Sequence, residues 1–107
     1  MRVIVAGSRT ITDYAVVIEA IRLSGFNIST LISGKARGVD TLGERYAKEH
    51  GIPIEEYPAL WNTYGKSAGY RRNVQMAEVA DALIAITNGS IGTQHMIDIA
   101  TAKGLSL

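Results

Sequence analysis

The sequence contains no cysteine and only two histidines, His50 and His95. The absence of cysteine excludes disulfides, thiolate metal sites and a cysteine nucleophile. Two histidines are too few for most metal sites built from protein side chains alone, so no metal is expected. Lysine and arginine total 11 against 10 acidic residues, and the net charge is +1. This balance gives no support to nucleic-acid binding, because proteins that hold nucleic acid by surface charge are far more basic.

Long apolar runs are missing as well. Residues 1–6 are apolar except for Arg2, but this run is too short for a signal sequence and leads directly into Gly7. No run approaches the ~20 residues that span a bilayer. We therefore expect a cytoplasmic protein without membrane contact. The chain has 107 residues, of which 47% are hydrophobic, and this predicts one domain over residues 1–107.

Short β-branched runs alternate with longer amphipathic stretches. Apolar runs predict strands at 3–6, 27–33, 52–54 and 82–86, and 105–107 predicts the beginning of a fifth. Helical spacing predicts helices from an N-cap at Thr12 to Gly25, from Val39 to Gly51, from Tyr70 to Val79, and through Met96 to Gly104. The strands are almost continuously apolar, which is typical of a sheet covered on both faces. We therefore predict an α/β, Rossmann-like three-layer domain, with parallel strands in the order 3-2-1-4-5 and helices on both faces.

The segment from Pro58 to Gly69 interrupts this alternation and is interpreted as a functional loop. Trp61 and Tyr64 lie within it, and Tyr70 follows it. These aromatic side chains would offer a stacking surface for a base, or they would fill the space beside a long loop. The sequence leaves both interpretations open.

Three glycine-bearing loops are predicted to meet at one edge of the sheet. Ligands of open parallel sheets bind beyond the carboxyl ends of the strands, where the strand order reverses. Residues 7–10, 33–40 and 88–93 reach that edge, and each loop precedes a helix whose free N–H groups attract phosphate. The pattern predicts a phosphate-bearing small molecule as ligand, although glycines also serve tight turns. The candidate ligand-binding residues are Gly7, Ser8, Arg9, Ser33, Gly34, Lys35, Arg37, Gly38, Lys66, Asn73, Asn88, Gly89, Ser90, Gly92 and Thr93.

Two common nucleotide motifs are incomplete. Gly7 stands alone where a dinucleotide fingerprint needs G-x-G-x-x-G, and Ser33 replaces the acidic residue at the end of the second strand. Leu60 occupies the place of the leading glycine of a P-loop that would end at residues 65–67. These departures disfavour an NAD dehydrogenase and a P-loop NTPase, and no cofactor is expected.

Arg72 is the first candidate catalytic residue. It shares a helix face with Met76, at the end nearer the loops, whereas Arg71 should be solvated. A guanidinium at the edge of a pocket binds phosphate or carboxylate, and a pair with a surface acid is the alternative.

His95 and Asp40 are the other two candidate catalytic residues. His95 precedes Asp98 by three residues, so the carboxylate would orient the imidazole for proton transfer; an exposed histidine near a helix start is the alternative. Asp40 lies one turn before Glu44 and would contact a ribose or complement the helix dipole.

Five segments occur in the order in which a known family has them. With Trp61 in the expected loop, the chain resembles the YspA/YpsA-related branch of the SLOG superfamily, which unites the LOG phosphoribohydrolases with the DNA-processing protein A family. The resemblance covers nearly the whole chain. The segments are residues 7–9, 33–40, 64–69, 72–77 and 92–93.

The resemblance implies a Rossmann-like fold, a nucleotide or nucleotide-derived ligand, a bacterial or phage origin and a homodimer, in which the third and fourth helices would pair. For an enzyme it implies hydrolysis of the N-glycosidic bond of nucleoside 5′-monophosphates, as in LOG enzymes. Arg72 with Met76 and Ala77, and Gly92 with Thr93, match the motifs of those enzymes, but His95 stands where they have glutamate. Residues 33–40 are similar to the DNA-processing proteins, which bind single-stranded DNA. The hypotheses are therefore a binding or sensing module, an N-glycosidase, and single-stranded DNA binding.

Overall fold

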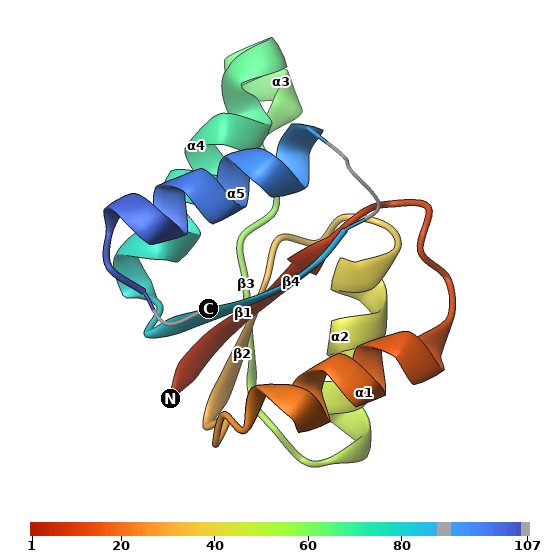
Figure 1. Cartoon of the computed structure of the whole chain (residues 1–107). Helices are drawn as coiled ribbons and strands as arrows, with labels where there is room; N and C mark the ends of the chain where they lie inside the picture. The colour runs from red at the N-terminus through yellow and green to blue at the C-terminus, as the bar shows by residue number, and fades with distance from the viewer. Residues whose placement is uncertain (88–90, 106–107) are drawn as a thin grey trace.

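A parallel sheet carries helices on both of its faces in the computed structural model, which describes residues 1–87 and 91–105 (Figure 1). Two short helical segments, α3 and η1, precede α4. The elements are β1 (Arg2–Gly7), α1 (Tyr14–Ser24), β2 (Thr30–Ser33), α2 (Val39–Glu49), β3 (Ile54–Glu56), α3 (Trp61–Tyr64), the 3-10 helix η1 (Gly65–Ser67), α4 (Ala68–Val79), β4 (Ala82–Ile86) and α5 (Ile91–Ala102).

The strands follow the order β3-β2-β1-β4, and every pairing is parallel. This confirms the parallel α/β sheet and the predicted order of the first four strands. The prediction of a fifth strand is wrong: the described chain has four strands. Leu105 lies outside any strand, because its N–H donates to the carbonyl of Ala100 at 3.0 Å and closes the end of α5. Ser106 and Leu107 lie outside the described residues.

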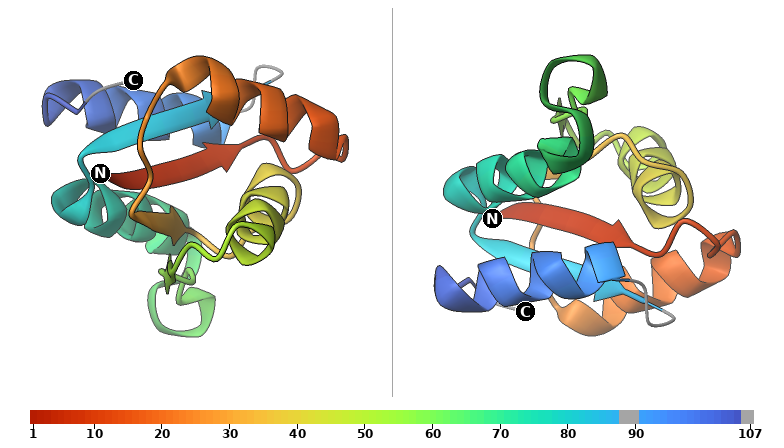
Figure 2. Two further views of the ribbon diagram at one scale, coloured as in Figure 1. Left: turned by 90° about the horizontal axis from the view of Figure 1, so that it is seen from below. Right: turned by 90° about the horizontal axis from the view of Figure 1, so that it is seen from above.

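Both faces of the sheet are buried, and alternate residues of each strand face opposite layers. Val3 and Val5 pack with α1 and α2, whereas Ile4 and Ala6 pack with α4 and α5. Figure 2 shows the sheet between these two helical layers. The three-layer arrangement explains why the strands are almost continuously apolar. No helix in residues 1–87 and 91–105 has the length and apolar character that a membrane crossing requires.

The boundaries of α1 differ from the prediction. Asp13, not Thr12, is the N-cap, and its carboxylate accepts from the N–H of Ala15 at 3.0 Å. Gly25 closes the helix with a left-handed backbone, as predicted. Val16 was expected in the apolar stripe but is 42% exposed, because Val17 and Ile21 are the residues of α1 that enter the core.

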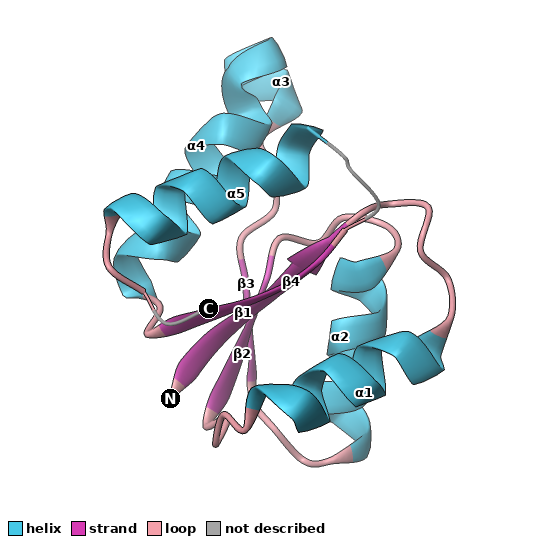
Figure 3. Ribbon diagram, in the orientation of Figure 1, coloured by secondary structure: helices cyan, strands magenta, loops and turns pink. Residues whose placement is uncertain are grey.

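Residues 58–69 are more helical than expected (Figure 3). Helix α4 begins at Ala68, before the predicted Tyr70, because the turn η1 leads into it directly. Strand β2 begins at Thr30, after the predicted Asn27. Strand β3 begins at Ile54, and Pro53, which has no N–H, precedes it and accepts from the N–H of Leu31 at 2.9 Å.

Gly38 fixes the approach of α2 to the loop after β1. Its φ of 73° is positive, and a Cβ there would lie 2.4 Å from the carbonyl oxygen of Ser8. Gly51 also has a positive φ, of 67°, but a Cβ there would meet no atom within 4 Å. The pair separates backbone strain from a steric clash.

We predict that Gly38→Ala lowers the free energy of unfolding by about 3 kcal/mol or more, because strain and a backbone clash combine. Gly51→Ala should lower it by about 1 kcal/mol, from strain alone. Urea unfolding followed by circular dichroism measures both values. Equal losses in the two variants would contradict this account of Gly38.

Candidate ligand-binding site

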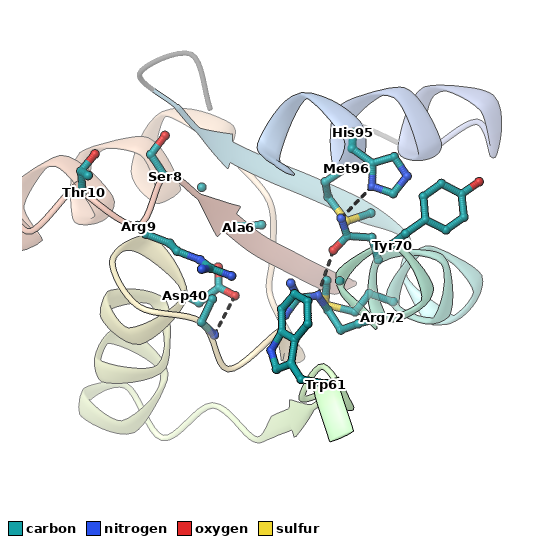
Figure 4. Close-up of a pocket in the computed structure, with 15 residues that line it drawn as sticks. Ala6, Ser8, Arg9, Thr10, Asp40, Trp61, Tyr70, Arg72, His95 and Met96 are labelled. Carbon is teal, nitrogen blue, oxygen red and sulfur yellow. Dashed lines mark hydrogen bonds between the residues drawn. The ribbon is translucent and has the colours of Figure 1, made fainter. Parts of the chain in front are cut away.

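A hollow of about 450 Å³ opens at the carboxyl ends of the strands (Figure 4). We call it the main hollow. The loop after β1 forms one side of it, and α4 and α5 form the other. This is the edge at which the sequence predicted a ligand. Its lining residues are Ala6, Gly7, Ser8, Arg9, Thr10, Ala36, Asp40, Trp61, Gly69, Tyr70, Arg72, Asn73, Met76, His95 and Met96.

The backbone of Ser8 holds the loop after β1 in place. Its N–H donates to the carbonyl of Ile86 at 3.0 Å. Its carbonyl accepts from the N–H groups of Ile11 at 3.3 Å and Val39 at 3.4 Å. The loop is therefore tied to β4 and α2, and the position of Arg9 follows from these bonds.

The Arg72 side chain is held over the loop after β2. Its Nη1 donates to the carbonyl of Gly34 at 2.5 Å, and its Nε donates to Oδ1 of Asn73 at 3.0 Å. A Cβ at residue 34 would lie 2.7 Å from Nη1, so glycine permits this close approach. Burial lowers the pKa of Arg72 and the positive charge of Arg9 lowers it further, whereas the charge of Asp40 raises it. Arg72 is thus on the buried side of α4 and Arg71 is exposed, as predicted.

A chain of hydrogen bonds runs from Arg72 to His95. The Nε of Arg72 can only donate, so Oδ1 of Asn73 accepts and Nδ2 of Asn73 donates. This Nδ2 lies 3.0 Å from Nδ1 of His95, which must therefore be the unprotonated nitrogen. In the neutral imidazole the proton lies on Nε2. That atom is buried without a partner in the described part of the chain.

The predicted pairing of His95 with Asp98 is not formed. Asp98 accepts instead from Nε2 of Gln94 at 3.0 Å, one turn away on the exposed side of α5. The imidazole of His95 stacks on the ring of Tyr70, with centroids 4.3 Å apart. The Asn73 amide and an aromatic ring, rather than a carboxylate, therefore orient this histidine.

Asp40 lies in the main hollow and is 5% exposed. Its carboxylate accepts from the N–H of Ala36 at 3.3 Å. Burial raises the pKa of Asp40, and the bond to Ala36 and the charge of Arg72 oppose that shift. Figure 4 shows Arg9 extending from its loop toward this carboxyl group.

Glu44 draws two predicted ligand-binding residues away from the main hollow. It is 7% exposed, and it accepts from the hydroxyl of Ser33 at 2.6 Å and from Nζ of Lys35 at 2.9 Å. Lys35 also lies 3.5 Å from Glu56. Ser33 is fully buried, so its assignment as a ligand contact is a misreading of an internal hydrogen bond.

The other candidates divide into three groups. Gly7, Ser8, Arg9 and Asn73 line the main hollow, and Gly34, Lys35 and Arg37 line a second hollow beside it. Lys66 is exposed and lines neither, and Gly38 packs on the backbone at residues 8–9. Asn88, Gly89 and Ser90 lie outside the described residues. Only the backbone of Gly92 and Thr93 is described, in the first turn of α5.

Several lining residues were not singled out from the sequence. Met76 and Met96 were expected in the core, and both are about 1% exposed, but they also form the floor of the main hollow. Helical spacing alone does not distinguish a core methionine from one that borders a pocket. Trp61 and Tyr70 line the hollow, whereas Tyr64 lines neither hollow and lies beneath the guanidinium of Arg71, 4.4 Å from its carbon.

The fold and this hollow define a class: an open, parallel Rossmann-type α/β domain whose pocket lies at the carboxyl ends of the strands. The model of the YspA, cpYpsA-related SLOG family matches residues 1–64, and the chain belongs to that family. The chain is also similar to the Gene 61 protein of Mycobacterium phage D29. They are 32% identical over 115 residues, which cover 97% of this chain and 91% of the phage protein.

We predict that the two histidines of the chain are in opposite neutral tautomers. His95 should carry its proton on Nε2, whereas Nδ1 of His50 lies 2.8 Å from the carbonyl of Tyr46 and must carry the proton there. Asn73→Asp should move the proton of His95 to Nδ1, because the new carboxylate can only accept. Nitrogen-15 NMR of the imidazoles at about pH 8 reports both residues in one spectrum. A proton on Nδ1 of His95 in the unmodified protein would contradict the hydrogen-bond chain.

We also predict a pH dependence that belongs to Asp40. Because its folded pKa is raised, the folded state holds this proton more tightly than the unfolded state. Asp40 therefore contributes a decrease in stability as pH rises from about 4 through the raised pKa. Asp40→Asn keeps the acceptor for Ala36 and lacks that dependence. Urea unfolding at several pH values should show the unmodified protein gaining stability relative to the variant at the acid end; a constant difference would argue against the shift.

Proposed function

We propose that the chain binds a nucleotide or a nucleotide-derived ligand through its phosphate in the main hollow. The observation that carries this proposal is the approach of two guanidinium groups. Arg9 and Arg72 both line the hollow, and Arg9 is close enough to lower the pKa of Arg72. Within the described residues, neither forms an ion pair with a carboxylate. A bound anion would relieve this repulsion.

The two arginines have different roles in this proposal. Arg72 is held rigidly by Gly34 and Asn73, so it presents a fixed direction for a hydrogen bond. Arg9 is exposed and extends from a loop, so it is able to close on an anion after it enters. Guanidinium groups bind phosphate through paired, charge-assisted hydrogen bonds.

The remainder of the main hollow suits a base. Met76 and Met96 provide an apolar floor, and Tyr70 with His95 provides a stacked aromatic pair. A volume of about 450 Å³ is within the range of small-molecule sites. Membership of the SLOG family supports a nucleotide-related binding or sensing role.

Hydrolysis of an N-glycosidic bond is the second candidate function. It is favoured by Asp40, a buried carboxyl with a raised pKa that lines the same hollow as Arg72. Such a group is suited to transfer a proton to a departing base or to stabilise positive charge on a ribose. His95 is less suited to this role, because Asn73 occupies its Nδ1 and its Nε2 is buried.

We predict that Arg9→Ala weakens nucleotide binding by about tenfold or more without loss of stability, because Arg9 is exposed and forms no ion pair among the described residues. Isothermal titration with AMP, GMP, UMP and CMP, at up to about 1 mM, measures the affinity. Trp61 is the single tryptophan of the chain and lines the hollow, so its fluorescence gives an independent reading.

Lys66→Ala is the matched control. It removes the same charge from an exposed residue that lines neither hollow, so it should leave binding unchanged. No heat and no fluorescence change with any nucleotide would overturn the proposal, as would an equal loss in both variants. Chromatography of the same samples detects free base, and its release by the unmodified protein but not by Asp40→Asn would establish the second candidate.

A further inference from the structure

A second hollow of about 290 Å³ adjoins the main hollow. We call it the side hollow. The loops after β2 and β3 form it, and Gly34, Arg37, Pro58 and Ala59 line it. It therefore opens at the same edge of the sheet as the main hollow but over β2 and β3.

The two hollows share the cations that we assign to phosphate. Arg9, Ala36, Trp61 and Arg72 line both. An anion bound between Arg9 and Arg72 would consequently have space on two sides. A nucleoside monophosphate with its phosphate in this position would occupy the main hollow and leave the side hollow without an occupant.

The two sides differ in chemistry. The main hollow contains two methionines and the stacked Tyr70 and His95, which suit a base. The side hollow contains Lys35 and Arg37 and the carbonyl-bearing loop at Gly34. Lys35 is neutralised by Glu44 and Glu56, whereas Arg37 is exposed and forms no ion pair in residues 1–87 and 91–105. Arg37 is thus available to a hydroxyl or an anion.

From this arrangement we infer that the ligand is a nucleotide whose phosphate carries a second polar group, such as a sugar or another nucleoside. The nucleoside lies in the main hollow, the phosphate or diphosphate lies between Arg9 and Arg72, and the second group lies in the side hollow beside Arg37. Trp61, which is 51% exposed and borders both hollows, covers the junction. This inference rests on the proposed function and narrows it.

The test compares ligands that differ only in the second group: AMP with ADP and ADP-ribose, and UMP with UDP and UDP-glucose. Isothermal titration should give an affinity for ADP-ribose or UDP-glucose about tenfold or more above that of its parent mono- and diphosphate. Comparable affinities across each series would overturn the inference and leave the proposed function intact. Failure of every nucleotide to bind would overturn both.

Two variants locate the second group. Ala59→Phe should fill the side hollow and Arg37→Ala should remove its available cation, so each should reduce the gain from the second group and leave AMP and UMP unchanged. Ala15→Phe, at an exposed position of α1 that lines neither hollow, is the control for an added ring. An equal loss for AMP and ADP-ribose in Arg37→Ala would contradict the placement, and this variant serves even where Ala59→Phe fails to fold.

Discussion

The buried guanidinium of Arg72 is the constraint on which the site depends. Burying a charged group is unfavourable unless hydrogen bonds and an opposite charge compensate. The carbonyl of Gly34 and the amide of Asn73 supply the bonds, and Asp40 supplies the charge. Through these partners one side chain of α4 connects the loop after β2, the start of α2 and, by way of His95, helix α5. Three loops that are distant in sequence are thereby held at one edge.

The same bonds determine what Arg72 offers to a ligand. A guanidinium has five N–H groups, and in the described chain Nε and Nη1 are directed to protein acceptors. Nη2 has no hydrogen-bond partner among the described residues, and the side chain lines both hollows. Arg72 is therefore both a structural tie and a binding group, and its replacement would disturb the loop as well as the ligand. Arg9, which carries no such ties, is the cleaner probe of binding.

The sequence was sufficient for those features that follow from local pattern. Apolar runs and glycines locate the four strands and their parallel order, and helical spacing places Arg72 on the buried side of α4. Partner choice was not predictable in the same way. Asp98 has the correct spacing for His95, yet Gln94 lies one turn away on the same helix and bonds to it, while Asn73 arrives from another helix. Spacing within a helix gives no information about the residues that a neighbouring helix brings.

Charge in the loop after β2 shows why basic residues cannot simply be counted. Lys35 and Arg37 are two residues apart, but a lysine with a left-handed backbone, at φ 59°, places its Nζ on Glu44. Because Glu44 and Ser33 satisfy one another in the interior, Lys35 serves the packing of α2 on β2. The field at the two hollows therefore comes from Arg9, Arg37 and Arg72 and is opposed by Asp40. Protonation of Asp40 would remove that opposition. An anion and a proton thus favour each other at this site, because each is repelled by the same carboxylate charge or replaces it.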